Sequence, residues 1–207
     1  MNRSLSRFTL ATTVAACTVL GACQKKGDVA VSDTTVASAM ADTTVSAGSV
    51  VSTKTDWNDA QILAFAKTAN SGEIAEAKLA QQKATTPAVK KFAALMIADH
   101  TKMLADGSAL ATKLAITPDT SRSDVRDLAK DGDMDLKELQ GKKAGKDFDE
   151  DYMEKQIDTH QKVLDKLNDA SKSAKAPELK SAVDASIAKV QAHLTQAKAI
   201  KDNGLKS

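Results

Sequence analysis

Three histidines are the residues of this chain best suited to chemistry, and each falls on or beside an apolar stripe of helical periodicity. The residue one helical turn before each histidine is apolar: Met96 before His100, Ile157 before His160 and Val190 before His193. Side chains on the apolar stripe of an amphipathic helix point into the core, and imidazole is a common metal ligand. The sequence therefore predicts three imidazoles that enter a protein interior from three separate helices.

Glu73 lies on a fourth stripe, built mainly from alanines, and is expected at the height of the histidines. Heights follow from the helical rise, counted from turns at residues 85–86 and 175–176 that are expected at one end of the molecule. This count places all four side chains roughly 18–26 Å from that end. Residues 70–72, Asn-Ser-Gly, are poor helix formers, and we expect them to distort the helix and make room there.

A carboxylate and three imidazoles in one layer would suit a transition-metal ion. Neutral imidazole and carboxylate ligands are typical of zinc, copper, iron and nickel sites, so the predicted ligands of a single ion are Glu73, His100, His160 and His193. The ferritin di-iron pattern is absent, because it needs a glutamate three residues before a histidine, and isoleucine or valine stands there in all three cases. We therefore predict no catalytic residues, no enzymatic activity and no residues for another cofactor.

The same layer also has a structural interpretation. Buried imidazoles and carboxylates without partners destabilise a fold. Glu73 hydrogen-bonded to one or two histidines would instead form a polar layer that only specifies packing. Ring nitrogens that approach a common point would favour the metal, and side chains that splay apart would favour the structural layer.

Four long segments have the 3.6-residue periodicity of amphipathic helices. They are expected at about residues 57–84, 87–115, 148–174 and 177–204. Between the second and third lies a polar connection, residues 117–147, in which we expect only short helices near 125–128 and 136–139. The chain has few turn formers, with nine glycines and three prolines. The sequence predicts an all-α fold, an up-down-up-down four-helix bundle over residues 56–203.

The N-terminus resembles a lipoprotein signal peptide. Arg3 and Arg7 precede an apolar run that is too short to span a bilayer, and residues 20–23, Leu-Gly-Ala-Cys, are similar to the bacterial lipobox. We expect a signal peptide over residues 1–22, lipidation of Cys23 and a disordered tether up to residue 55. Gln24 stands where an aspartate would favour the inner membrane, so the outer membrane, facing the periplasm, is the expected location.

Processing at Cys23 would also remove Cys17 and leave no free thiol, which excludes disulfide and thiolate chemistry. Without Arg3 and Arg7 the chain has 27 basic and 27 acidic residues. A balanced charge gives no reason to expect nucleic acid as a partner. The expected partner is the membrane, through the N-terminal lipid, and the sequence indicates no protein partner.

Several motifs resemble a bacterial envelope family known as domain of unknown function 4142. The resemblance covers about residues 57–201 and is carried by Glu73, Pro87-Ala88-Val89, Asp99-His100, Phe148-Asp149, Tyr152, His160 and His193. It implies a ferritin-like fold and an exported or outer-membrane protein. It implies no established activity.

The sequence leaves two functions open. The favoured one is a non-enzymatic envelope module that acts through interaction or stress protection. The alternative is transition-metal binding or sequestration in the bundle core, through the layer of Glu73 and the histidines. Oxidase or peroxidase chemistry is least supported, because the Glu-x-x-His pairs of di-iron enzymes are missing.

Overall fold

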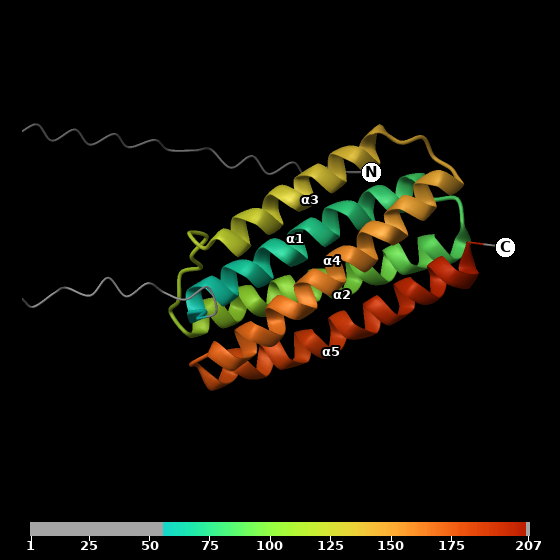
Figure 1. Ribbon diagram of the computed structural model, residues 1–207. Coiled ribbons are helices and arrows are strands. Elements are labelled where there is room, and N and C mark those ends of the chain that lie inside the picture. The colour runs from blue at the N-terminus through green and yellow to red at the C-terminus, as the bar shows by residue number, and fades with distance from the viewer. Residues whose placement is uncertain (1–55, 206–207) are drawn as a thin grey trace, which may run out of the picture. The chain divides into compact units, whose positions relative to one another are not determined.

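The computed structural model describes residues 56–205, which form five α-helices and no strand (Figure 1). The helices are α1 (Asp59–Lys83), α2 (Pro87–Lys113), α3 (Ser123–Gly141), α4 (Lys146–Ser173) and α5 (Pro177–Ala199), followed by a π-helical turn, Ile200–Gly204. The all-α prediction is confirmed. None of the described helices is both long and apolar enough to cross a membrane. The predicted signal peptide, the lipidated Cys23 and the tether lie outside the described residues.

Local sequence explains where the helices begin. The Gln61 N–H donates to Asn58 Oδ1 at 2.9 Å and the Asn58 N–H donates to Gln61 Oε1 at 3.3 Å, a reciprocal cap for α1. Pro87 and Pro177 are the first residues of α2 and α5, where a missing N–H costs nothing. Gly145 precedes α4 with a φ of 149°, which only glycine adopts readily.

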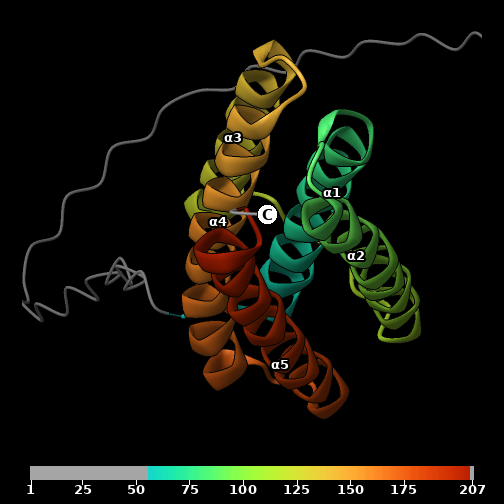
Figure 2. The same ribbon diagram turned by 90° about the vertical axis from the view of Figure 1, so that its right-hand side faces the viewer.

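Helices α1, α2, α4 and α5 form a four-helix bundle of two pairs, α1 with α2 and α4 with α5 (Figure 2). The end of α1 lies beside the start of α4, as the hydrogen bond from the Thr86 N–H to the Asp149 carboxylate at 2.7 Å shows. The start of α1 lies beside the end of α4, because the Ala176 N–H donates to Asp59 at 3.0 Å. The two hairpin turns therefore lie at opposite ends. The bundle runs up-down-down-up, and the predicted up-down-up-down order was wrong.

The reason for the different order is α3. The polar connection was predicted to hold only short helices, but α3 is a single helix of 19 residues. It runs alongside α1 and returns the chain to the end where α1 finishes (Figure 1), where Lys83 Nζ donates to the Leu139 and Lys142 carbonyls at 3.2 and 2.7 Å. Most of α3 faces water, since its buried residues are only Asp124, Val125 and Leu139.

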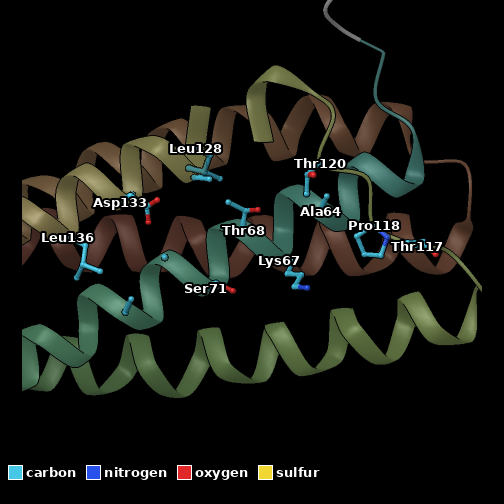
Figure 3. Close-up of a pocket in the computed structure, with 14 residues that line it drawn as sticks. Ala64, Lys67, Thr68, Ser71, Thr117, Pro118, Thr120, Leu128, Asp133 and Leu136 are labelled. Atoms are coloured by element: carbon cyan, nitrogen blue, oxygen red, sulfur yellow. The ribbon is translucent and has the colours of Figure 1, made fainter. Parts of the chain in front are cut away.

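A cavity of about 530 Å³ lies between α1 and α3. Figure 3 shows Thr68 and Ser71 on α1 and Leu128 on α3 along its walls. Gly132 of α3 also lines it, and a Cβ added there would meet no atom within 4 Å. The two helices therefore leave unfilled space along a seam of mostly small side chains.

The bundle core has two apolar clusters with a polar layer between them. The first cluster, towards the start of α1, includes Trp57, Phe65, Leu167 and Leu179. The second, towards the α1–α2 turn, includes Phe92, Met96, Phe148, Tyr152 and Met153. Along the helices, the residues between these clusters form the polar layer, which consists of the buried side chains of Asn70, Glu73, Glu76, His100, Gln156, His160 and His193. Buried polar groups need partners, so the hydrogen bonds in this layer decide what it can do.

Two aspartates hold the two hairpin turns. Asp149 of α4 is fully buried and accepts hydrogen bonds from the Thr85 N–H, the Thr85 hydroxyl and the Thr86 N–H of the α1–α2 turn. Asp59 of α1 accepts hydrogen bonds from both N–H groups of residues 175–176 in the α4–α5 turn. Each aspartate thus belongs to one hairpin and holds the turn of the other.

Candidate metal centre

Three helices bring the three imidazoles together in the polar layer. His100 comes from α2, His160 from α4 and His193 from α5, and their exposed fractions are 3%, 1% and 2%. One ring nitrogen of each histidine lies within 4.8 Å of one ring nitrogen of each of the others. The ring centroids are 5.2 to 5.8 Å apart. Three of the four predicted ligand residues therefore meet at one place.

Each imidazole uses one ring nitrogen, here called the outer nitrogen, to donate a hydrogen bond to an oxygen. The three bonds are His100 Nδ1 to Asn70 Oδ1 (2.8 Å), His160 Nδ1 to the Gln156 carbonyl (2.8 Å) and His193 Nε2 to an Asp99 carboxylate oxygen (2.9 Å). Carbonyls and carboxylates only accept, so the outer nitrogens that face them carry the ring proton. The Asn70 amide is oriented by its own Nδ2, which donates to the Ala66 carbonyl at 2.8 Å, so its oxygen faces His100.

The second nitrogen of each ring, the free nitrogen, is buried without a hydrogen-bond partner among residues 56–205. The free nitrogens are His100 Nε2, His160 Nε2 and His193 Nδ1. Because the outer nitrogen holds the proton, each free nitrogen has an unused lone pair. Metal-binding histidines have this pattern, in which one nitrogen donates to an oxygen and the other binds the ion. An unpaired buried acceptor destabilises a fold, and an ion bound by these nitrogens would remove that cost.

Burial keeps the imidazoles neutral near pH 7. Burial, with the charges that His160 and His193 would carry, lowers the pKa of His100 to about 3. Burial also lowers the pKa of His160 to about 4, and it lowers the pKa of His193, although Asp99 opposes that change. Neutral imidazole is the form that binds metal, so all three side chains are in the binding form without losing a proton.

Glu73, the fourth predicted ligand, lies beside an outer nitrogen. Its Oε1 is 3.4 Å from His160 Nδ1, the nitrogen that donates to the Gln156 carbonyl. Its carboxyl group is not part of the cluster of ligand atoms that the three histidines form in the described chain. Burial raises the pKa of Glu73 to about 8, so the carboxyl group holds its proton at neutral pH.

The polar layer continues beyond Glu73 along the facing sides of α1 and α4. Gln156 Nε2 donates to Glu76 at 3.0 Å. Burial, together with the charge of Glu73, raises the pKa of Glu76 to about 9. Tyr152, one helical turn from Gln156, is fully buried and its hydroxyl has no partner among the described residues. At neutral pH this side of the layer therefore holds neutral acids next to neutral imidazoles.

The outer partners Asn70 and Asp99 were not predicted as site residues. The sequence predicted a distortion at residues 70–72, but α1 is continuous through them, and this prediction was wrong. Asn70 stands three residues before Glu73 and so shares its helix face, a spacing that could have identified it. The partner of His160 is a backbone carbonyl, for which side-chain identity carries no signal.

The common height of the histidines holds although the second hairpin is reversed. His160 lies in the middle of α4, about 14 residues from either end. Reversing α4 therefore leaves the height of His160 almost unchanged.

Comparison with known proteins shows the family. The chain belongs to the family described as Domain of unknown function (DUF4142), whose model matches residues 40–200, which confirms the resemblance seen in the motifs. Among curated proteins, none matches the chain. A solved structure described as "CopM in the Cu(II)-bound form" has a similar fold, with a TM-score of 0.57 and 20% identity over 72% of this chain and 98% of that chain. At this level of identity the likeness concerns the fold alone.

Proposed function

We propose that this DUF4142 protein binds a single transition-metal ion, copper before other metals, through the free nitrogens of His100, His160 and His193. One observation carries the proposal: in all three rings the outer nitrogen is held by an oxygen, and the other nitrogen is buried with an unused lone pair. An ion bound there would supply the partner that these three nitrogens lack.

Copper is the first metal to test. Imidazole ligands suit several first-row metals, and the affinity of a given site for divalent ions generally peaks at copper. The solved structure of similar fold is itself described as Cu(II)-bound. The donor set is compatible with zinc as well, so the experiment below compares the two metals.

We assign Glu73 to the outer side of His160, where its Oε1 lies 3.4 Å from Nδ1, and not to the ligands. The proposed function is binding or sequestration and not di-iron oxidation, because the chain has no Glu-x-x-His pair. An exported, lipid-anchored protein that sequesters copper would also protect the cell envelope. The two functions left open by the sequence then become one.

The test is the metal content and copper affinity of untagged protein extracted from the cell envelope. We expect one equivalent of copper, with nitrogen couplings in the electron paramagnetic resonance spectrum of the Cu(II) form. His100→Ala should lose the stoichiometric metal. Asp99→Asn removes the anionic partner of His193 and should weaken binding about 10- to 100-fold. Asp133→Asn changes an exposed acid on α3 and should leave the affinity unchanged.

Two results would contradict the proposal. Wild-type protein without any stoichiometric metal would leave the polar layer as a packing device. Full copper binding by His100→Ala would place the ion elsewhere. One equivalent of zinc with no uptake of copper would keep the three-histidine site and correct the metal.

A further inference from the structure

A cleft of about 300 Å³ opens between α2 and α5 and reaches the outer side of the metal centre. Its walls include Asn70 and Asp99, the hydrogen-bond partners of His100 and His193. A smaller cavity of about 40 Å³ between α1 and α2 shares Asn70 and Met103 with the cleft. The Asp99 side chain is 21% exposed, whereas the His193 side chain is 2% exposed. The cleft therefore leads from solvent to the groups that hold the imidazoles.

The core is closed on the opposite side of the histidines. Going from the polar layer towards the α1–α2 turn, Phe92, Met96, Phe148 and Tyr152 are all fully buried. Two of the aromatic pairs pack with ring centroids 6.4 Å apart. An ion moving along the bundle axis from that end would have to displace this aromatic packing, which makes the cleft the more accessible route.

Met103 is the cleft residue best placed to guide copper. It follows His100 by three residues, so both side chains lie on one face of α2, and Met103 is half-buried. A thioether is a soft ligand that selects Cu(I), and methionine is flexible enough to move with a passing ion.

The charged groups that line the cleft, two lysines and two aspartates, are paired with each other. Lys102 pairs with Asp106 at 2.6 Å and Lys189 pairs with Asp99 at 3.3 Å. These lysines compete with an incoming cation for the carboxylates. The thioether of Met103 carries no charge and needs no release from a lysine.

We propose that copper enters and leaves the three-histidine site through this cleft as Cu(I), with the Met103 thioether as a transient ligand before His100. The oxidation state of the ion does not change during the transfer. This inference rests on the proposed copper site and adds to it the route and the form of the ion.

The experiment measures how fast the metal-free protein takes copper from a coloured Cu(I) chelate under anaerobic conditions, and separately its equilibrium affinity. Met103→Leu keeps the volume of the side chain and removes the sulfur. We expect it to slow Cu(I) uptake by about tenfold or more, with Cu(II) uptake and the equilibrium affinity unchanged. Met96→Leu is the matched control, because Met96 is one turn before His100 and does not line the cleft. It should load at the wild-type rate.

A second variant tests the route without changing a sulfur. Ser186 lines the cleft from α5, and Ser186→Phe should obstruct it and slow both Cu(I) and Cu(II) uptake. Wild-type uptake rates in both Met103→Leu and Ser186→Phe would overturn the route. A loss of affinity in Met103→Leu equal to its loss of rate would make Met103 a resident ligand and would also overturn it. A wild-type protein that takes up no copper would instead overturn the proposed function itself.

Discussion

At the scale of single residues, the polar layer contains groups whose pKa values move in opposite directions for one reason, burial. The imidazoles favour their neutral, unprotonated form, with a pKa of about 3 for His100 and about 4 for His160. The carboxyl groups favour their neutral, protonated form, with a pKa of about 8 for Glu73 and about 9 for Glu76. The layer as a whole is therefore uncharged near neutral pH.

This opposition predicts that the metal-free protein is most stable between about pH 4.5 and 6.5. Below pH 6.5 the histidines of the unfolded chain bind protons, whereas the buried imidazoles of the folded protein do not. Stability therefore falls as the pH falls towards the pKa values of the folded-state histidines. Above pH 4.5 the unfolded chain releases protons that Glu73 and Glu76 keep in the fold, so stability falls as the pH rises towards 9. From pH 6.5 to 9 only the carboxyl groups contribute, and we expect a loss of about 2 kcal/mol or more.

Urea denaturation in the presence of a metal chelator, from pH 4 to 9, measures this profile. Glu76→Gln should flatten the alkaline side, since it removes one of the two protons. Glu150→Gln, at an exposed position of α4, is the control and should keep the wild-type profile. An alkaline slope that is the same in Glu76→Gln and wild type would disprove the assignment.

The sequence predicted the histidines of the site better than it predicted the residues that hydrogen-bond to them. A histidine on an apolar stripe can be recognised from spacing alone, because the helix fixes which side chains share a face. Asp99 lies next to His100 in the chain but bonds His193 of α5, a contact that exists only once the hairpins pack. Glu73 was placed at the correct layer, but spacing along a helix could not show which nitrogen of His160 it would approach.

At the scale of helices and turns, the hydrogen bonds from each hairpin's turn to an aspartate of the other hairpin should contribute strongly to stability. Asp149→Ala would leave the two N–H groups and the hydroxyl at the α1–α2 turn without their buried acceptor. We expect a loss of about 2–4 kcal/mol in the free energy of unfolding. Asp59→Ala opens two bonds that are nearer to solvent and should cost about 1 kcal/mol. Equal losses in the two variants, measured by urea denaturation, would contradict this ranking.

The loose seam between α1 and α3 predicts a stabilising substitution. Gly132→Ala adds a methyl group where there is open space and removes backbone freedom from the unfolded chain, so we expect a gain of about 0.5–1 kcal/mol. Gly145→Ala is the contrasting variant. Its φ of 149° strains any side chain, so it should destabilise the protein. Thermal unfolding compares the two variants. A destabilised Gly132→Ala would show that the packing of α1 and α3 requires a residue without a side chain at position 132.

The long polar connection shows where periodicity failed as a guide. The four bundle helices were predicted close to their observed bounds because each buries a continuous stripe. By contrast, α3 buries residues near its two ends, Asp124, Val125 and Leu139, and covers a cavity between them. Its centre therefore has a weak apolar signal, with only Ala129 and Gly132 on the stripe between Leu128 and Leu136.

At the scale of the whole molecule, the sequence predicted the bundle but not the direction of its second hairpin. The expected order followed from short turns and a connection with only short helices. A helical connection long enough to run beside α1 brings the chain back to the other end before α4 begins (Figure 1). Because hairpin direction depends on the length and shape of one connection, it could not be read from the helices themselves.

The predicted anchor is also a property of the whole molecule. Cys23→Ser should abolish incorporation of labelled fatty acid and move the protein from the membrane fraction to the soluble periplasmic fraction. The free energy of burying an acyl chain, about 0.8 kcal/mol per methylene, would then no longer hold it at the bilayer. Cys17→Ser, within the predicted signal peptide, should still be lipidated. Labelling that persists in Cys23→Ser would exclude this cysteine as the lipid attachment site.

The three histidines are divided between the two hairpins, His100 in the first and His160 and His193 in the second. An ion held by all three would tie the halves of the polypeptide together much as a cross-link does, and it would favour the folded state in proportion to its occupancy. Copper supply would then set the lifetime of the protein. The loaded form would resist proteases, and the copper-free form, which lacks this cross-link, would be degraded first.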